Sequence, residues 1–341
     1  MLTVWMSPKN NSSNKYNDIF SSSIEGESIK VNNFSKKKIF KIKKGDIVHF
    51  HWVSFFYQHN NVFIMLIRTT IFLLFLLFLK SKKIKIIWTV HNLYPHKYKK
   101  KNLEKVIRSI IMLMCNKIIV AAFSIKNEVI REFSVNPQKI EVVPHGHYKG
   151  FYPIKKENFR EKYNISSDNF VLLFVGAIKK YKGIPELLNV YSRLNNKKIN
   201  LIIAGKVYDE LDGFLKKYKT RKNIIIDNRF IPDDELADLI LSCDYVVLPY
   251  TSITTSGTAI LAVSLRKKII CPKTPFMDEY FDDSTSVKYN RLDNNGLYNA
   301  LKWSFINRQY KDINDNSYNK FLEKLSWSSI AKKIKAIYLS L

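Results

Sequence analysis

Short apolar runs alternate with amphipathic segments along the whole chain, and this alternation predicts the fold. The first half holds five β-branched runs that end in polar or turn residues, at 2–6, 46–51, 85–90, 117–122 and 140–143. Buried parallel strands have this composition. Segments 102–116 and 124–133 have the apolar spacing that is typical of helices between such strands. Strands that alternate with helices indicate an open α/β sheet.

The same pattern starts again in the second half. Its apolar runs lie at 170–175, 200–204, 224–226, 245–248 and 269–271, with helical segments near 184–194, 233–242 and 256–265. The chain is therefore predicted to hold two doubly wound, Rossmann-like domains that face a central cleft, at residues 1–150 and 151–325. The linker between them is expected near Pro144–Pro153, which is rich in Gly, His, Tyr and Pro.

Segment Val62–Leu79 is apolar enough to be considered for a membrane. Arg68, Thr69 and Thr70 interrupt it, and the nine unbroken residues Ile71–Leu79 are fewer than the roughly 20 that cross a bilayer. The pattern favours a helix buried between the sheet and its neighbours over a membrane-spanning helix. A helix that partly enters a membrane face stays open, because Lys80, Lys82, Lys83 and Lys85 follow it.

Charge adds a second signal. The chain carries 56 Lys and Arg against 29 Asp and Glu, a net charge of +27, and residues 1–150 alone carry +17. No acidic residue lies between Asp46 and Glu104. A region of one sign indicates an anionic partner, which can be nucleic acid, phospholipid headgroups or a phosphorylated substrate.

Cysteine usage and length narrow the class of protein. The three cysteines, at 115, 243 and 271, lie in apolar stretches without a CxxC pair, which excludes a disulfide framework or a cysteine zinc site. Met1–Ser7 is too short an apolar run for a secretory signal. A length of 341 residues with 46% hydrophobic residues fits two packed domains in a reducing, cytoplasmic compartment.

Histidines mark the ends of the predicted strands. Six of the seven histidines follow strands or lie in the linker: His49, His51, His91, His96, His145 and His147. In open α/β sheets ligands bind at this edge. No HExxH motif or paired HxH-plus-carboxylate set is present, so a metal site is disfavoured. Neutral histidines that hydrogen-bond sugar hydroxyls or phosphate oxygens fit better.

Two segments of the second half suggest a diphosphate site. Gly176 ends a predicted strand and precedes Lys179, Lys180 and Lys182, so the backbone can approach a ligand and lysines can neutralise it. Segment 256–258, Ser-Gly-Thr, opens a predicted helix whose N–H groups can bind phosphate, although a plain N-cap is the alternative. Neither GxxxxGK[ST] nor GxGxxG is present, which argues against a P-loop or a dinucleotide redox cofactor.

The chain resembles the GT-B-fold glycosyltransferases of the retaining family 4 type, which serve bacterial surface-polysaccharide synthesis. The matching segments appear in the family's order at 46–52 (DIVHFHW), 88–96 (WTVHNLYPH), 143–147 (VPHGH), 176–183 (GAIKKYKG), 231–236 (IPDDEL), 249–250 (PY) with 256–257 (SG), and 326–331 (SWSSIA). No single segment is decisive, but the ordered set is fairly specific and covers about residues 40–335.

The resemblance implies roles for individual residues. Lys179 and Lys182 would bind the diphosphate of a nucleotide-sugar donor, and His91 would lie beside the donor sugar as the catalytic residue. The other donor-binding positions implied are Gly176, Thr255, Ser256, Gly257 and Thr258. The cleft and acceptor positions are His51, Asn92, His96, His145 and His147. The final segment, 326–341, would form a helix that crosses back to the first domain with Trp327 as a packing anchor.

One motif of the family is missing. Many members carry two glutamates spaced E-x7-E around the Ser-Gly helix, whereas the equivalent positions here are Ile253 and Leu261. Glu279, expected in the next loop, is a candidate to contact the ribose instead. The sequence therefore leaves the donor sugar and the stereochemistry open.

The function expected from the resemblance is that of a hexosyltransferase of class EC 2.4. It would move a sugar from a nucleotide-diphosphate sugar to a polyprenyl-diphosphate-linked saccharide, without a metal or other cofactor, at the anionic inner face of the cell membrane. No nucleic acid is expected as a partner. Two alternatives are an inactive GT-B-like scaffold of a polysaccharide assembly complex and a basic nucleic-acid-binding protein.

Overall fold

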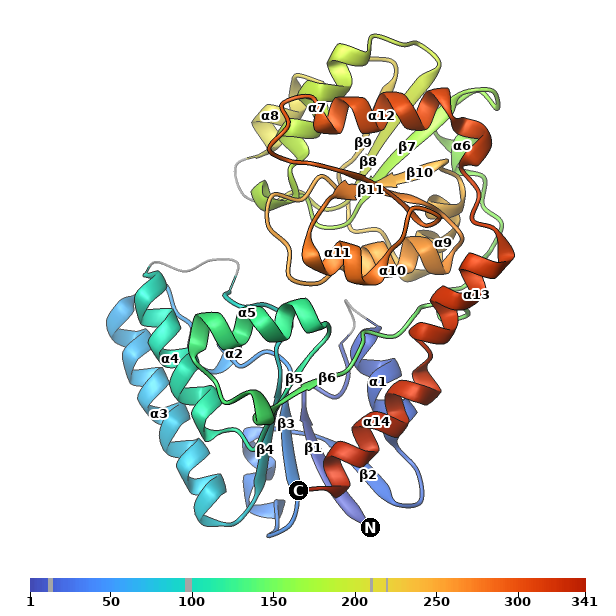
Figure 1. Cartoon of the computed structure of the whole chain (residues 1–341). Helices are drawn as coiled ribbons and strands as arrows, with labels where there is room; N and C mark the ends of the chain where they lie inside the picture. Colours follow the sequence, from blue (N-terminus) through green and yellow to red (C-terminus); the bar gives the residue numbers. More distant parts are fainter. Residues whose placement is uncertain (12–14, 96–99, 209–210, 219) are drawn as a thin grey trace. The chain divides into compact units, whose positions relative to one another are not determined.

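The chain forms two compact α/β units. The computed structural model describes all residues except 12–14, 96–99, 209–210 and 219 (Figure 1). Unit 1 consists of Met1–Gly146 together with Leu325–Leu341, and unit 2 consists of His147–Lys324. The sequence pattern placed the boundaries after residues 150 and 325, within a few residues of these positions.

Unit 1 is built on a six-stranded parallel sheet in the order β2-β1-β3-β4-β5-β6. Its strands are β1 (Leu2–Ser7), β2 (Ile29–Asn33), β3 (Ile47–Phe50), β4 (Lys85–Thr89), β5 (Lys117–Val120) and β6 (Ile140–Val142). The pattern predicted all of them except the edge strand β2. Only one face of β2 is buried, so its sequence, IKVNN, lacks a continuous apolar run.

Helices cover both faces of this sheet. They are α1 (Tyr16–Ile24), η1 (Lys36–Lys41), α2 (Ser54–Tyr57), α3 (Val62–Ser81), α4 (Lys101–Met114), α5 (Phe123–Phe133), η2 (Pro137–Lys139) and α14 (Trp327–Leu339). Figure 1 shows α1 beside α14 on one side of the sheet and α3 beside α4 on the other. Trp327 is buried, and a Cβ at Gly146 would overlap its ring, so only glycine fits there.

Unit 2 repeats the architecture with six parallel strands in the order β12-β11-β10-β7-β8-β9. The strands are β7 (Phe170–Val175), β8 (Ile199–Ala204), β9 (Ile224–Asp227), β10 (Tyr245–Val247), β11 (Ile269–Pro272) and β12 (Ser286–Tyr289). Here too, the strand that the pattern missed, β12, lies at an edge. Strands β7 and β8 are buried at every position, which explains their unbroken apolar sequences.

The helices of unit 2 connect these strands. They are α6 (Phe159–Lys162), η3 (Lys180–Lys182), α7 (Ile184–Leu194), α8 (Asp212–Lys216), α9 (Asp233–Leu241), α10 (Gly257–Ser264), α11 (Pro275–Tyr280), α12 (Gly296–Ile306), η5 (Arg308–Tyr310) and α13 (Asp315–Lys324). Figure 1 shows α7 and α12 on one face of the sheet and α9, α10 and α11 on the other. Cys115 of unit 1 and Cys243 and Cys271 of unit 2 are all buried.

The expectation that Val62–Leu79 is a buried helix was wrong. Helix α3 spans 20 residues without a break, but only Met65, Thr69, Phe72, Leu76 and Leu79 are buried. These five residues recur every three or four positions and form one narrow stripe against the sheet. The rest of the helix surface faces solvent although most of its side chains are apolar.

Candidate functional site

Four histidines of unit 1 meet at the carboxyl edge of its sheet. His49 and His51 lie at the end of β3, His91 follows β4, and His145 follows β6. The rings of His49 and His51 stack with centroids 4.6 Å apart, and those of His51 and His91 are 5.4 Å apart. The structure thus brings together four of the six histidines that the sequence placed at strand ends or in the linker.

Hydrogen bonds fix the orientation of these rings. His49 Nδ1 lies 2.6 Å from the Tyr338 hydroxyl of α14, and its Nε2 lies 2.7 Å from Thr89 Oγ1. His51 Nδ1 lies 3.1 Å from His91 Nε2. Both rings are thereby held by groups that come from other elements of the unit.

The tautomers of the His51–His91 pair follow from one unpartnered atom. His51 Nε2 is buried without a hydrogen-bond partner. A buried orphan N–H is rarer than a buried orphan acceptor, so we assign the His51 proton to Nδ1, which donates to His91 Nε2. His91 then carries its own proton on Nδ1.

Burial keeps this cluster neutral. It lowers the pKa of His49 to about 3, with a further contribution from His91, and lowers the pKa of His145 to about 4. Burial also lowers the pKa values of His51 and His91 well below the usual value, and the neighbouring histidines lower them further. Near neutral pH these side chains therefore act as uncharged hydrogen-bond donors and acceptors rather than as cations.

Aromatic rings surround the histidines. The ring of Tyr16, from α1, lies 4.4 Å from that of His145 and 5.2 Å from that of His91, and Trp52 stacks on His91 at 4.7 Å. Tyr16 and Tyr338 were missed by the sequence analysis, because nothing in their local pattern indicates a contact with strand ends far away along the chain. Trp52 could have been found, since it adjoins His51.

A buried ion pair supports the loop after β4. Arg108 of α4 donates from Nη1 to the backbone oxygen of Asn92 at 3.1 Å, and its Nε lies 3.7 Å from Glu104 Oε2. Tyr57 donates to the same Glu104 oxygen at 2.9 Å. The structure therefore assigns Asn92, through its backbone, to the support of the loop that carries His91.

Two further histidines were predicted as cleft positions, His147 and His96. His147 belongs to unit 2, where it is half-buried and where burial, followed by the nearby charge of Lys149, lowers its pKa. His96 lies outside the described residues.

In unit 2, the ends of β7 and β8 approach each other closely. Gly176 and Gly205 follow these strands with φ of +127° and +149°, and a Cβ on Gly205 would lie 1.9 Å from the Gly176 oxygen. Such conformations require glycine. A Cβ on Gly176 would face Thr258 Oγ1 at 3.9 Å. The predicted glycine loop and the predicted helix start are therefore neighbours.

Lysines of this edge lie over tyrosine rings. Lys182 Nζ is 3.9 Å from the centroid of the Tyr250 ring, and Lys179 Nζ is 5.0 Å from that of Tyr208. Lys206, which the sequence analysis did not single out, lies 5.9 Å from the Tyr208 ring. Cation–π contacts of this kind hold an ammonium group in place without neutralising its charge.

Helix α10 starts beside the loop that carries Lys179 and Lys182. The Ser256 side chain caps it by accepting from the Ala259 N–H at 3.1 Å, and Thr255 precedes the cap. Helix geometry leaves the N–H groups of Gly257 and Thr258 without intrahelical partners, so this end can bind an anion. The loop that leads into α10 is bonded to the lysine loop, because the Thr251 N–H donates to the Tyr181 backbone oxygen at 2.9 Å.

Glu279 is not in a loop, contrary to expectation. It lies in the last turn of α11, one residue before the helix ends, and its backbone oxygen accepts from Lys324 Nζ. The helix forms because Thr274 caps it and Pro275 occupies its first position. Leu261, at one of the positions of the absent glutamate pair, is buried inside α10.

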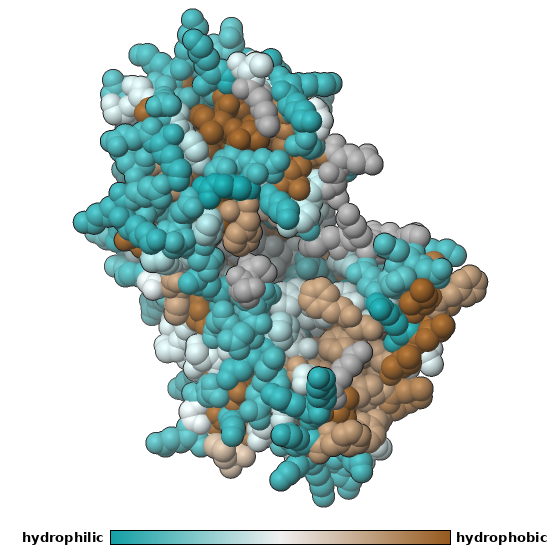
Figure 2. Space-filling view, turned by 180° about the vertical axis from the view of Figure 1, so that it is seen from behind, coloured by the Kyte–Doolittle hydropathy of each residue, from teal (hydrophilic) through white to brown (hydrophobic). Residues whose placement is uncertain are grey.

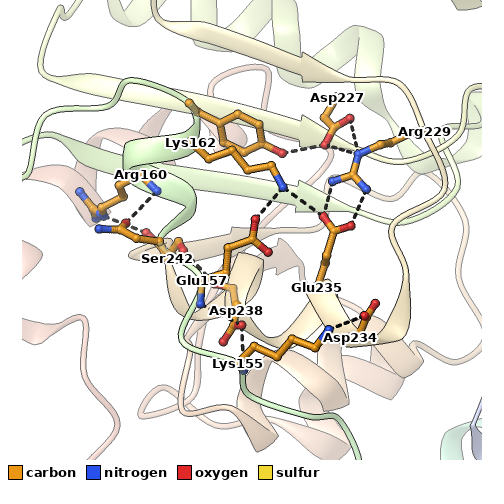
Figure 3. A network of polar contacts seen from close by, with 12 residues as sticks. Lys155, Glu157, Arg160, Lys162, Asp227, Arg229, Asp234, Glu235, Asp238 and Ser242 are labelled. Atoms are coloured by element: carbon orange, nitrogen blue, oxygen red, sulfur yellow. Dashed lines mark hydrogen bonds and ion pairs between the residues drawn. The ribbon is translucent and has the colours of Figure 1, made fainter.

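Segment 231–236 has a structural role in this chain. Arg229 binds Glu235 through two bonds of 2.9 and 2.5 Å and also contacts Asp227 at 3.0 Å (Figure 3). Lys162 bridges Glu157 and Glu235, at 2.7 and 3.4 Å. The network joins the first residues of unit 2 to α9 and β9, and it uses Glu235 of this motif for ion pairs within the unit.

Metal binding can be examined for the residues that the structure describes. Outside the gaps in the description, the structure has no group of three or more His, Cys, Asp or Glu side chains arranged to hold a metal ion. The histidine cluster is instead linked by hydrogen bonds and ring contacts.

Comparisons with known proteins agree with this arrangement. Residues 34–147 match the family described as Glycosyltransferase Family 4, and residues 155–291 match Glycosyl transferases group 1. A GDP-mannose:glycolipid 4-beta-D-mannosyltransferase from Xanthomonas campestris pv. campestris is 24% identical over 233 residues, which are 68% of this chain and 62% of that protein. A lipopolysaccharide 1,2-N-acetylglucosaminetransferase from Salmonella typhimurium is 21% identical over 58% of this chain and 55% of that protein. The chain thus spans about three fifths of the length of the curated relatives it matches.

Solved structures show the same fold. Anabaena HepE in complex with UDP and glucose superimposes with a TM-score of 0.75 at 12% identity, over 100% of both chains. Sucrose-phosphate synthase from Thermosynechococcus elongatus gives 0.74 at 14% identity, over 100% of this chain and 98% of that one. The predicted two-domain GT-B architecture is confirmed.

Proposed function

Because the chain belongs to the GT-B glycosyltransferases, we propose that it transfers a sugar from a nucleotide-diphosphate sugar to a lipid-linked saccharide. The observation that carries this proposal is the carboxyl edge of unit 2. There the lysine loop, Gly176 and the start of α10 adjoin one another. Ammonium groups together with helix N–H groups suit a diphosphate.

The proposed chemistry is electrostatic. As the bond between the anomeric carbon and the diphosphate oxygen breaks, its electron pair goes to that oxygen. Lys179, Lys182 and the N–H groups of Gly257 and Thr258 would stabilise the developing negative charge. The acceptor hydroxyl forms the new glycosidic bond with the anomeric carbon, and its proton passes to the departing diphosphate. His91, held by His51 and stacked on Trp52, would hydrogen-bond a sugar hydroxyl as a neutral ring.

We further propose that the reaction needs no metal and retains the anomeric configuration. The cationic groups of unit 2 take the place that a metal would have at the diphosphate. The name of the Xanthomonas relative specifies a 4-beta-D-mannosyl linkage. A further relative, 22% identical over 62% of this chain and 51% of its own length, is named MMP alpha-(1->4)-mannosyltransferase, from Mycolicibacterium hassiacum. The configuration should therefore be measured on the product itself, by the anomeric coupling constant in its NMR spectrum.

The acceptor is proposed to be a lipid-linked saccharide at the cytoplasmic face of the membrane. The name of the Xanthomonas relative specifies a glycolipid acceptor, and that of the Salmonella relative specifies lipopolysaccharide. The net charge of +27 suits an anionic surface.

One observation favours a GT-B protein without transfer activity as the alternative. Apolar Ile253 and Leu261 stand where many members of the family carry glutamates. A panel of UDP-, GDP- and dTDP-sugars, screened for protection against heat unfolding, separates the two. An active enzyme is stabilised by one of them and turns it over, whereas a scaffold does not turn over any.

Two substitutions test the assigned residues once a donor is known. Lys182→Ala removes a charge beside the diphosphate and His91→Ala removes the sugar contact, so each should lower transfer more than tenfold. Circular dichroism and the unfolding midpoint would establish that both variants keep the fold. Turnover near the wild-type rate in both variants contradicts the assignment.

A further inference from the structure

The exposed surface of α3 is unusually apolar for a helix on the outside of a domain. Ten residues between Phe63 and Phe78 are exposed, and eight of them are large and apolar: Phe63, Ile64, Leu66, Ile67, Ile71, Leu74, Leu77 and Phe78. Only 28% of the most apolar 18-residue stretch of α3 is buried. Water-facing helix surfaces normally carry polar side chains, and contiguous apolar patches mark binding surfaces.

Neighbouring helices extend this patch. Helix α4, which lies beside α3, exposes Val106, Ile110 and Leu113, and α2 exposes Phe55. Figure 2 shows hydrophobic side chains gathered on this flank, at the right of the view. We call these residues of α2, α3 and α4 the apolar flank. Its breadth exceeds the single stripe that one partner helix would cover.

Charge identifies the partner. Lys80, Lys82 and Lys83 are exposed at the end of α3, directly beside the apolar flank. No acidic residue lies between Asp46 and Glu104, the segment that holds α2 and α3. A broad apolar surface edged by lysines is complementary to a leaflet with anionic headgroups, because the apolar side chains enter the acyl region while the lysines stay at the headgroups.

The buried stripe of α3 decides how the helix meets the lipid. Among the described residues α3 is the one helix long and apolar enough to cross a membrane, at about 30 Å for its 20 residues. However, Met65, Phe72 and Leu76 are buried in unit 1. A spanning helix would leave this packing and uncover the apolar side chains of β4.

We propose that the apolar flank of unit 1 docks onto an anionic lipid leaflet, with α3 lying in the plane of the membrane and still packed on its own sheet. This inference deepens the proposed function, since it assigns the surface that brings the enzyme to a lipid-linked acceptor.

The test is cosedimentation of the full-length protein with phosphatidylcholine vesicles, with and without phosphatidylglycerol. The variant Ile67→Gln/Ile71→Gln/Leu74→Gln changes three exposed residues of the flank, so it keeps the fold. The matched control is Ile154→Gln/Leu292→Gln/Ile306→Gln, three exposed apolar residues of unit 2. The flank variant should lose vesicle binding at least about tenfold, and the control should bind as the wild type does.

A charge variant tests the second feature. Lys80→Gln/Lys82→Gln should weaken binding to the anionic vesicles by about thirtyfold, since each lysine near such a surface strengthens binding roughly fivefold. Binding to pure phosphatidylcholine should change little.

Three outcomes would overturn the proposal. The first is a flank variant that binds vesicles as tightly as the wild type does. The second is bound wild-type protein that resists alkaline carbonate extraction, which indicates a spanning helix. The third is a stable wild-type dimer that the flank substitutions, but not the control substitutions, convert to monomers. Sugar transfer is measured separately, on a water-soluble acceptor. If the flank variant loses vesicle binding and neither the wild type nor any variant transfers sugar, the docking surface is supported and the proposed function is refuted. If the protein transfers sugar and the flank variant binds vesicles as the wild type does, the proposed function is supported and the docking surface is refuted.

Discussion

At the scale of single residues, Tyr250 shows how a buried ring can position a charge. Tyr250 is buried, and its hydroxyl has no hydrogen-bond partner. Its ring nevertheless lies 3.9 Å from Lys182 Nζ. The contribution of Tyr250 therefore comes from its aromatic face and not from its hydroxyl group.

Substitution of Tyr250 separates these two parts. Tyr250→Phe keeps the ring and removes only the unpartnered hydroxyl, so donor affinity should stay within about twofold of wild type. Tyr250→Leu removes the cation–π contact, which is worth about 1–2 kcal/mol, and should weaken donor binding by roughly five- to thirtyfold. The measurement is the donor dissociation constant by calorimetry. Equal loss in the two variants would show that Lys182 does not depend on the ring.

Sequence reasoning at this scale found groups that follow strands and missed groups that arrive from elsewhere. His51, His91 and His145 were predicted together because the carboxyl ends of parallel strands meet at one edge. Tyr338 was not, because its contact with His49 joins residues 289 positions apart and no local pattern encodes it. The roles of the donor-site residues stay predictions.

At the scale of elements, α4 carries an ion pair that serves the loop after β4. Glu104 and Arg108 are 2% and 3% exposed, one turn apart, and Arg108 Nε has no hydrogen-bond partner. Each charge is therefore balanced mainly by the other. Removal of one partner leaves the other buried and unpaired, which costs far more than the pair contributes.

A double-mutant cycle tests this balance. Glu104→Gln should lower the free energy of unfolding by roughly 3–5 kcal/mol, because it isolates the Arg108 guanidinium. Glu104→Gln/Arg108→Met should recover part of that loss, since no unpaired charge remains. The third variant of the cycle is Arg108→Met, and urea unfolding followed by circular dichroism gives the free energy of unfolding of all three. A loss in the double variant that exceeds the summed losses of the two single variants would contradict the ion-pair interpretation.

Elements were predicted well where burial is complete and poorly where it is partial. Strand β7 and helix α7 lie where the pattern put them, because their apolar positions are continuous or strictly periodic. The two missed strands, β2 and β12, are edge strands with alternating polar side chains. For α3 the pattern predicted the helix but not its exposure, because composition alone does not distinguish a buried helix from one that faces lipid.

At the scale of the whole molecule, the neutral histidine cluster couples stability to pH. The pKa of His49 is lowered to about 3 and that of His145 to about 4, whereas an unfolded histidine titrates near 6.5. Between these values the unfolded chain binds more protons than the folded one. The contribution of these neutral histidines to the free energy of unfolding is therefore complete above about pH 6.5, and it is lost as the pH drops toward 4.

This predicts a measurable slope. Each such histidine should contribute up to about 1.4 kcal/mol per pH unit across that range. Urea unfolding at a series of pH values should show His145→Asn with a slope smaller by about this amount. A wild-type profile that stays flat from pH 7 to pH 4.5 would contradict a buried, neutral cluster.

The architecture as a whole was the most predictable level. Two runs of alternating strands and helices indicate two parallel sheets almost regardless of which apolar residues fill them. The GT-B fold followed from this repetition and from the ordered segments of the family. Contacts that depend on individual side-chain positions were not encoded at that level.

The buried cysteines give the molecule a practical property. Burial raises the pKa of all three thiols, Cys115, Cys243 and Cys271, to about 12. Maleimide and thiol-specific nitroxide reagents should therefore not react with the native protein. The variant Ile71→Cys or Leu74→Cys would then carry a single reactive thiol, and none of the three native cysteines would have to be replaced. Paramagnetic quenching of a label at that position would read the immersion depth of the helix directly.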